Sequence, residues 1–221
     1  MDKHHEYGGA MKSDFKRLIP SYTAKHGQFS VMTVPTMQYL MIDGHGDPNT
    51  ARSYREALAT LYPVAYALKF LSKRELGQDY TVMPLEALWW SDDMESFTTA
   101  RDKSRWNWTV LNMVPQWVTR DHLETARETT AKKGDAPVLE ELRLEPLDEG
   151  LCVQTLHVGP YDDEGPVLEE MHNKFIPEQE LKMTGRHHEI YLSDPRRTAA
   201  EKLKTILRQP VRSVSSFGED R

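Results

Sequence analysis

Residues 36–68 read TMQYLMIDGHGDPNTARSYREALATLYPVAYAL and contain the pattern that decides the fold. The apolar run at 36–43 predicts a β-strand, and a turn with two glycines follows it. Apolar residues spaced by three and four positions along 51–68 then predict an amphipathic helix. Pro63 lies inside this helix, and we expect a kink or a restart there because proline removes a backbone hydrogen bond.

Two stretches rich in aromatic and β-branched residues follow, at 80–90 and 106–113. This composition predicts two strands that pair as a hairpin. A charged segment at 120–133 comes next, and the preceding Thr119 predicts a capped helix. The first half of the chain therefore has the order strand, helix, strand, strand.

The second half repeats parts of this order. The segments 138–144 and 151–158 predict a second hairpin, and the apolar spacing around 167–175 predicts a helix. Residues 187–193, HHEIYLS, predict another strand, and residues 203–207 are expected to form a short helix. Two like halves would share one antiparallel sheet and leave between them a central cleft, which is a common place for a small ligand.

The predicted fold class is α+β, with tandem strand–helix–strand–strand repeats. A chain of 221 residues is long enough for one domain of this kind. We expect an N-terminal extension at 1–34, a single ligand-binding domain at 35–210 and a polar tail at 211–221. The two halves of the domain are expected to cover 35–134 and 138–210.

Composition excludes several classes of protein. No stretch approaches the roughly 20 apolar residues of a membrane-spanning helix, and the N-terminus lacks the apolar core of a signal peptide. The single cysteine, Cys152, lies in an apolar run, which is typical of a buried thiol in a reducing compartment. We therefore expect a cytoplasmic protein without membrane contact, as a monomer or a homodimer.

Charge and motifs exclude further classes. A net charge of −6 without a basic stripe argues against direct binding of nucleic acid. No phosphate-binding loop, nucleophile elbow or dinucleotide motif occurs, so no cofactor is expected. The adjacent histidines His187 and His188 would point to opposite faces of a strand, which is poor geometry for one metal ion, and no metal is expected.

The strand at 187–193 carries the first candidate site residues. Side chains alternate along a strand, so Glu189 and Tyr191 share one face while His188 and Ile190 share the other. If the helices cover the face of His188, the carboxylate and the phenol line the opposite surface together. The alternative is that this polar face is simply solvated, as one face of an antiparallel sheet often is.

A similar string occurs in the first half, where LEAL and a following SD occupy residues 85–92. Their counterparts in the second half are HEIY and SD at 188–194. This match makes Glu86 the counterpart of Glu189 and a candidate for the same pocket.

Five tryptophans lie close together in the sequence: Trp89, Trp90, Trp106, Trp108 and Trp117. On a hairpin, they can approach one another as cross-strand pairs. They form either part of the core or the stacking walls of a pocket for a flat ligand. Adjacent residues of a strand point to opposite faces, so Trp89 and Trp90 cannot both face such a pocket.

The strings LHVGPYDDEGPVLEEM at 156–171 and HHEIYLSDPRRTAAEKLKTILRQPV at 187–211 resemble the GyrI-like superfamily of small-molecule-binding domains. The resemblance extends over roughly residues 35–210 and is closest to stand-alone members. It implies a tandem repeat of the SHS2 type with an aromatic groove between the halves. A glutamate on the late strand sits in that groove, and the matching residue here is Glu189. The region before the first predicted strand is too short for a DNA-binding helix-turn-helix, so we do not expect a transcription factor.

Some stand-alone members are similar to cyclopropanoid hydrolases, which open the strained ring of DNA-alkylating antibiotics of the yatakemycin and CC-1065 type. The resemblance therefore implies detoxification or self-resistance by addition of water to a cyclopropane. Glu189 would activate the water, and Tyr191 would act as a hydrogen-bond donor or orient the base. The further candidate ligand-binding residues are Glu86 and the aromatic residues Trp89, Trp90, Trp106, Trp108 and Tyr161.

Two other functions remain open. The same glutamate would suit a protein that binds aromatic or cationic molecules without turnover and acts by sequestration. A module that occludes a partner protein is the third possibility. The enzyme predicts many turnovers and a product with added water, whereas sequestration predicts stoichiometric protection with the ligand recovered intact.

Overall fold

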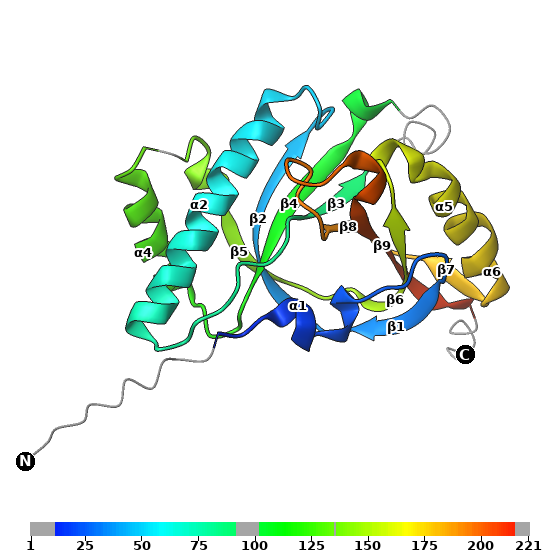
Figure 1. The fold of residues 1–221 in the computed structure, drawn as a ribbon, viewed down its shortest axis with the longest axis horizontal. Helices are drawn as coiled ribbons and strands as arrows, with labels where there is room; N and C mark the ends of the chain where they lie inside the picture. Colours follow the sequence, from blue (N-terminus) through cyan, green and yellow to red (C-terminus); the bar gives the residue numbers. More distant parts are fainter. Residues whose placement is uncertain (1–11, 92–101, 135, 215–221) are drawn as a thin grey trace, which may run out of the picture.

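In the computed structural model, the described residues 12–91, 102–134 and 136–214 build one antiparallel sheet of nine strands (Figure 1). The strands are β1 (Ser30–Val34), β2 (Met37–His45), β3 (Glu86–Trp90), β4 (Asn107–Val114), β5 (Arg143–Leu147), β6 (Gly150–Val158), β7 (Leu181–Met183), β8 (His187–Tyr191) and β9 (Lys204–Ser213). The start of the predicted extension, 1–11, and the end of the predicted tail, 215–221, lie outside the described residues.

The α-helices are α1 (Phe15–Leu18), α2 (Arg52–Glu75), α4 (Arg120–Ala131), α5 (Gly165–Glu170) and α6 (Ile176–Glu178). A π-helical turn, η5 (Met171–Phe175), joins α5 to α6. The short 3-10 turns are η1 (Pro20–Tyr22), η2 (Lys103–Arg105), η3 (Leu139–Glu141), η4 (Tyr161–Asp163) and η6 (Ala200–Lys202). In the described part of the chain, no helix is long and apolar enough to cross a membrane.

The order of the strands confirms the tandem repeat. The sheet runs β1-β6-β9-β8-β3-β4-β2-β5, with β7 paired to β9. The first repeat is β2-α2-β3-β4, and the second is β6, the segment α5 to α6, β8 and β9. The predicted hairpin of β3 and β4 is present. The two repeats meet where β3 pairs with β8, at the centre of the sheet.

Each repeat receives its outer strand from the segment that leads into the other repeat. β1 precedes β2 in the chain but pairs with β6, and β5 precedes β6 but pairs with β2. The prediction of a hairpin between 138–144 and 151–158 was therefore wrong. The two strands are adjacent in the sequence, but β5 pairs with β2 of the first repeat and β6 pairs with β1 and β9.

Two further predictions failed at the edges of the repeats. Residues 203–207 were expected to form a helix, but they lead into and begin β9, a ten-residue strand between β6 and β8. Ile206 belongs to the core on one face and Leu207 to the core on the other, so the apolar residues do not alternate with polar ones. Strand β1, inside the expected N-terminal extension, was not predicted.

The first predicted helix is longer than the pattern indicated. α2 runs from Arg52 to Glu75 and continues through Pro63 without a restart. The apolar residues on either side of the proline, including Leu61 and Val64, pack into one core, which holds both parts of the helix in line. α4 begins as predicted, with Thr119 accepting a hydrogen bond from the backbone of His122.

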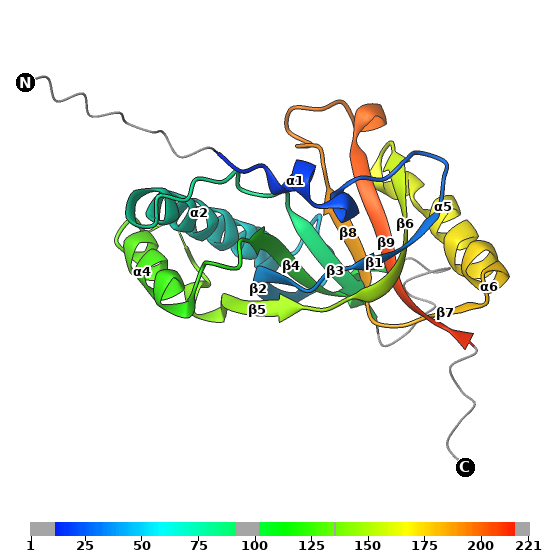
Figure 2. The same cartoon turned by 90° about the horizontal axis from the view of Figure 1, so that it is seen from below.

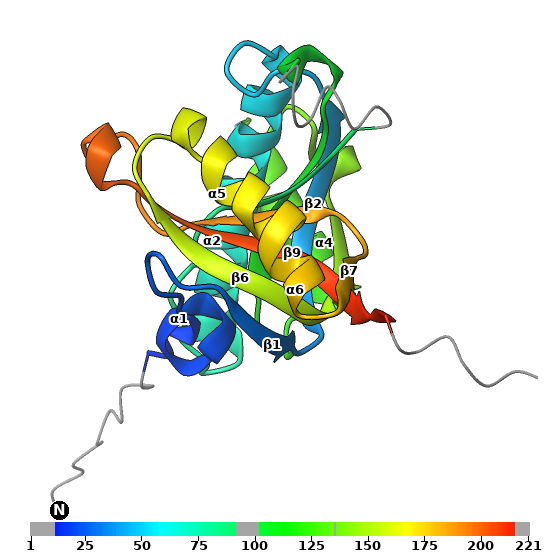
Figure 3. The ribbon, with the colours of Figure 1, turned by 90° about the vertical axis from the view of Figure 1, so that its right-hand side faces the viewer.

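All the long helical segments cover the same face of the sheet, as Figures 2 and 3 show. α2 and α4 pack on the first repeat, and the segment from α5 to α6 packs on the second. Glu189 and Tyr191 point to this helix face. The condition considered from the sequence, that the helices cover the face of His188, is not met: that face packs beneath the N-terminal segment that contains α1 and η1.

The face of His188 holds a buried network of charged groups. His188 lies between two carboxylates, with Nδ1 2.9 Å from Oε1 of Glu149 and Nε2 2.9 Å from Oε2 of Glu86. Arg208 donates to Oε2 of Glu149 at 2.7 Å and to the backbone oxygen of Ser21 at 2.7 Å. Glu86, His188 and Arg208 are each 0% exposed. The network thus links β3, β8, β9, the β5–β6 turn and the N-terminal segment.

Opposite charges keep His188 and Glu149 ionised in spite of their burial. Burial alone would lower the pKa of His188, but the charge of Glu149 and hydrogen bonds to both carboxylates raise it to about 9. Burial would raise the pKa of Glu149, but His188 and Arg208 lower it to about 2. An ion pair of this kind is costly to break because the remaining charge stays buried without its partner.

The raised pKa of His188 makes stability depend on pH. A histidine with a folded pKa of about 9 and an ordinary value of 6.5 stabilises fully below pH 6.5 and loses that contribution as the pH rises through 9. Between pH 7 and pH 9.5 we expect the free energy of unfolding to fall by on the order of 2 kcal/mol more in the native chain than in His188→Gln.

Urea unfolding at the two pH values measures this difference. NMR of the His188 imidazole in the native chain should show a midpoint near pH 9. Equal pH dependence in the native chain and the variant would contradict the prediction.

Candidate functional site

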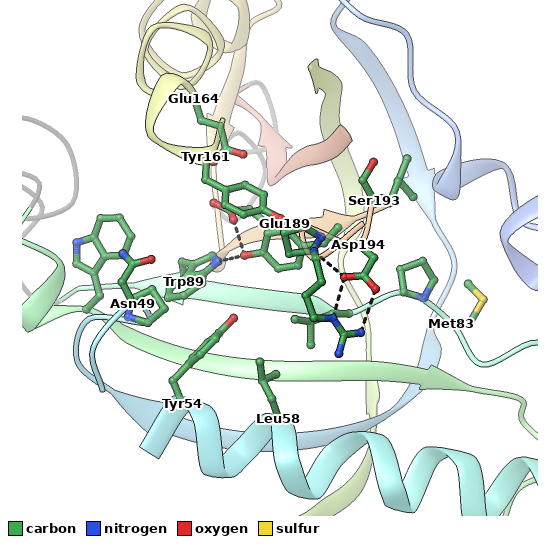
Figure 4. Close-up of a pocket in the computed structure, with 18 of the residues that line it drawn as sticks. Asn49, Tyr54, Leu58, Met83, Trp89, Tyr161, Glu164, Glu189, Ser193 and Asp194 are labelled. Carbon is green, nitrogen blue, oxygen red and sulfur yellow. Dashed lines mark hydrogen bonds and ion pairs between the residues drawn. The ribbon is translucent and has the colours of Figure 1, made fainter. Parts of the chain in front are cut away.

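The helix face carries a cavity of about 1430 Å³ between α2 and the segment from η4 to α5 (Figure 4). Side chains of β3 and β8 form its floor, at the junction of the two repeats. A central cleft in this place is what the tandem repeat predicted. Its size accommodates a drug-sized organic molecule.

Aromatic rings and carboxylates are prominent in the lining. The rings belong to Tyr54, Tyr62, Tyr66, Trp89, Trp106, Tyr161 and Tyr191. The carboxylates belong to Asp14, Glu164, Glu169, Glu189 and Asp194. Aromatic faces stack on flat molecules and attract cations, so this lining suits a flat aromatic ligand.

Glu189 and Tyr191 form a hydrogen-bonded pair on the floor of the cavity. The hydroxyl of Tyr191 donates to Oε2 of Glu189 at 2.6 Å, and the indole N–H of Trp89 donates to the same hydroxyl at 3.1 Å. The side chain of Glu189 is 12% exposed. The alternation predicted for β8 therefore brings the carboxylate and the phenol together, as expected, and adds an indole from β3.

The phenol of Tyr191 stays protonated. Burial, followed by the charge of Glu189, raises its pKa well above the ordinary value of 10. It therefore remains a donor to the carboxylate at neutral pH. The hydroxyl of Tyr191 donates a hydrogen bond to Glu189 and accepts one from Trp89. Tyr191 is therefore fixed, and it holds the carboxylate in one orientation.

Glu164 is a second acid in the cavity that sequence reasoning missed. It follows η4, is 3% exposed and lines the cavity together with Glu189. Burial, then Glu164, then Glu189 raise the pKa of Tyr161 to about 12, so this phenol is also protonated. The sequence contains three acids in a row here, and nothing local showed that only the third faces inward.

One histidine lies beside Glu189, and a second contacts the first. Nε2 of His187 is 3.4 Å from Oε1 of Glu189, and the ring of His187 meets that of His172 edge to face at 6.1 Å. Burial, followed by the charge of His187, lowers the pKa of His172 to about 4. His172 is therefore neutral at pH 7 and offers the cavity a hydrogen-bonding imidazole. Sequence reasoning missed it because it lies on a helical turn outside the quoted strands.

The structure separates the candidate tryptophans into two groups. Trp89 and Trp106 line the cavity and meet edge to face at 5.6 Å. Trp108 is 0% exposed, and its indole lies so close to Gly44 that a Cβ there would overlap it. Trp90 points to the opposite face, where the guanidinium of Arg186 lies 3.5 Å from its ring centre.

Glu86 lies away from the cavity, contrary to the string match with Glu189. It points to the face of His188, where the hydroxyl of Tyr22 donates to its Oε1 at 2.6 Å. In the sheet, Ala87 pairs with Glu189 and Glu86 pairs with Ile190. Glu86 therefore shares the face of Ile190 and His188, and the string match aligned residues from opposite faces of the sheet.

The chain has the fold of a known family. Residues 27–212 match the family model of the GyrI-like small molecule binding domain. This chain belongs to the GyrI-like family. The tandem repeat and the central cavity of the GyrI-like domain agree with the resemblance noted in the sequence. Among the described residues, no three His, Cys, Asp or Glu side chains are grouped as a metal site.

Two solved structures from Listeria innocua are similar to this GyrI-like domain over 91% of its chain and 100% of theirs. One is described as an uncharacterized conserved protein, with 39% identity and a TM-score of 0.83. The other is described as a hydrolase, with 38% identity and a TM-score of 0.78.

The C-terminal domain of EcmrR has 10% identity and a TM-score of 0.53, with 85% of this chain and 98% of that chain covered, which shows the fold alone. None of the curated protein sequences compared with the chain matches it.

The two adjacent tryptophans of β3 test the assignment of the cavity. We expect Trp89→Phe to weaken binding of the planar cation proflavine by about tenfold, because it removes stacking area and the N–H that orients Tyr191. Trp90→Phe, on the same strand, should leave the affinity within roughly twofold. Fluorescence anisotropy measures both. Equal losses in the two variants would contradict the placement of the binding site.

Proposed function

We propose that this GyrI-like domain is a hydrolase that opens the cyclopropane of DNA-alkylating cyclopropanoid compounds, of the yatakemycin and CC-1065 type. The product would no longer alkylate DNA, so the reaction would serve detoxification or self-resistance. The observation that carries the proposal is the carboxylate of Glu189, oriented by Tyr191 at 2.6 Å on the floor of an aromatic cavity. The description of a similar Listeria protein as a hydrolase also supports it.

The chemistry requires a base and an acceptor of electrons. In these compounds the cyclopropane is conjugated to a dienone. The oxygen of water bonds to a ring carbon, the adjacent carbon–carbon bond breaks, and its electrons pass to the carbonyl oxygen, which becomes a phenolate. Glu189 would take a proton from the attacking water and return it to solvent, and the phenolate would take a proton from solvent. One water is added in total.

The position of Glu189 suits a general base. Its side chain is only 12% exposed but lines the cavity, so a bound ligand and one water can reach it while bulk water is excluded. One oxygen accepts from Tyr191, and the other is 3.4 Å from Nε2 of His187. A base must lie within hydrogen-bond reach of the proton that it removes, and orientation by neighbours keeps it there.

The aromatic walls favour a flat substrate. Trp89 stacks on Tyr54 at 6.1 Å and 23° and meets Trp106 edge to face at 5.6 Å, so three rings form one wall. Tyr161 stands on the other side, edge to face with Tyr191 at 5.5 Å. An indole-derived alkylator could lie between these rings with its reactive end above Glu189.

Ring opening by catalytic amounts of protein tests the proposal. We expect the native chain to convert a spirocyclopropyl cyclohexadienone to the water-added phenol over many turnovers, as followed by mass spectrometry. Glu189→Gln keeps the size of the side chain but removes the base, and it should lower kcat by about a hundredfold or more. Glu169→Gln makes the same substitution at an exposed carboxylate of the cavity rim and should retain activity.

The outcomes separate the alternatives. Full turnover in Glu189→Gln would remove Glu189 from the mechanism. Stoichiometric protection with intact ligand recovered would replace the hydrolase by a sequestering protein.

Sequestration of a cationic aromatic molecule is the second candidate, and one observation favours it. Two acids of low exposure, Glu164 and Glu189, share the cavity with several aromatic rings. Carboxylates and aromatic faces both attract cations, and the attraction is stronger where water is excluded. In this case Glu189→Gln should weaken proflavine binding, and no product should form.

A further inference from the structure

The proposed ring opening needs a hydrogen-bond donor at the carbonyl oxygen, where negative charge develops. Tyr191 was the sequence-based candidate, but its hydroxyl donates to Glu189 at 2.6 Å. It cannot hold the base and serve the carbonyl at the same time. The donor must therefore be another group that lines the cavity near Glu189 and keeps its proton.

Tyr54 meets these conditions. It lies near the start of α2, and its side chain extends from that helix into the cavity (Figure 4). No hydrogen bond of its hydroxyl is found among the described residues, whereas the hydroxyl of Tyr191 is engaged twice. Burial, followed by the charge of Glu189, raises the pKa of Tyr54 above the ordinary value, so its phenol remains a donor.

The ring of Tyr54 is held by two indoles. It stacks on Trp89 at 6.1 Å and 23° and meets Trp108 edge to face at 5.0 Å and 85°. Trp108 is itself fixed, because its indole N–H donates to the backbone oxygen of Gly46 at 3.2 Å. A donor fixed before the reaction stabilises developing charge without the cost of reorganisation.

Tyr161 is the other phenol near Glu189 without a hydrogen bond among the described residues, and it is held less firmly. It belongs to the short turn η4, and within the described part of the chain its ring has one aromatic partner, Tyr191, at 5.5 Å. It lies at the side of the cavity opposite α2, and like Tyr54 it is partly buried. Tyr54 is therefore the better preorganised of the two donors.

We infer that Tyr54 is a further catalytic residue, whose hydroxyl donates a hydrogen bond to the carbonyl oxygen of the substrate. The inference rests on the proposed hydrolysis. Tyr54 keeps its proton throughout and stabilises the oxygen as the carbon–carbon bond breaks. The phenolate product then takes its proton from solvent. Trp108, which sequence reasoning placed in the pocket wall, acts instead by positioning the ring of Tyr54.

The kinetic test compares Tyr54→Phe with Tyr161→Phe. Both variants keep the ring and lose only the hydroxyl, so packing on Trp89 and Trp108 is retained in Tyr54→Phe. On a spirocyclopropyl cyclohexadienone, Tyr54→Phe should lower kcat by about a hundredfold and leave KM within roughly threefold, because the contact strengthens as charge develops. Tyr161→Phe removes the competing phenol from the cavity wall and should lower kcat far less than Tyr54→Phe does.

A binding test separates this inference from the hydrolysis itself. Fluorenone and fluorene have nearly the same flat shape, but only fluorenone has a carbonyl oxygen. The native chain should bind fluorenone about tenfold more tightly than fluorene, and Tyr54→Phe should lose that preference while Tyr161→Phe keeps it. Isothermal titration calorimetry in the same solvent measures the dissociation constants of both ligands.

Each combination of results decides the matter. If the native chain opens no cyclopropane but prefers fluorenone through Tyr54, the hydrolysis fails and the carbonyl donor stands. If Tyr54→Phe retains native kcat and native preference for fluorenone, the inference is overturned. The same holds if Tyr161→Phe alone shows the losses, since the donor would then be the phenol of η4.

Discussion

The antiparallel pairing of β3 with β8 joins the two repeats, and both the cavity and the buried charges depend on it. Ala87 pairs with Glu189, and Leu88 pairs with His188. Because side chains alternate, this register sends Glu189 and Trp89 to the helix face and sends Glu86 and His188 to the other face. A change of one residue in the register would turn each of these side chains to the other face. Both the acid in the cavity and the buried ion network would then be lost.

The two faces of the sheet hold a glutamate in different surroundings. Glu86 has Tyr22 at one oxygen and His188 at the other, and it is 0% exposed, so it serves the fold alone. Glu189 is held through one oxygen by a phenol and lines a cavity of about 1430 Å³. The N-terminal segment covers the first group, whereas the gap between α2 and α5 leaves the second accessible to a ligand. A buried carboxylate with a partner at each oxygen stabilises the fold, whereas a carboxylate beside a cavity can also contact a ligand.

Local patterns in the sequence correctly predicted which side chains of one strand share a face. The alternation in HHEIYLS correctly grouped Glu189 with Tyr191, and the rule that adjacent residues diverge correctly separated Trp89 from Trp90. Long-range pairing was beyond these patterns. The strand β9 is buried on both faces and has no alternation to recognise, and β5 passes over its neighbour β6 to pair with β2. The network around His188 draws on five separate segments, so no single string contains its signal.

The hydroxyls around Glu189 differ from the polar groups that stabilise the fold. Several polar groups buried in the sheet are satisfied by short contacts, such as the 2.7 Å hydrogen bond from Arg208 to the backbone oxygen of Ser21. Tyr54 and Tyr161 enter the cavity as phenols that hold their protons, with no hydrogen bond of either hydroxyl among the described residues. A phenol that faces a cavity with its proton retained can donate to a ligand, and a carbonyl oxygen is a suitable acceptor. Trp89, which stacks on Tyr54, also lines the cavity, and Trp108 holds the same ring from outside it, so recognition of an aromatic ketone depends on how α2 packs on β3 and β4.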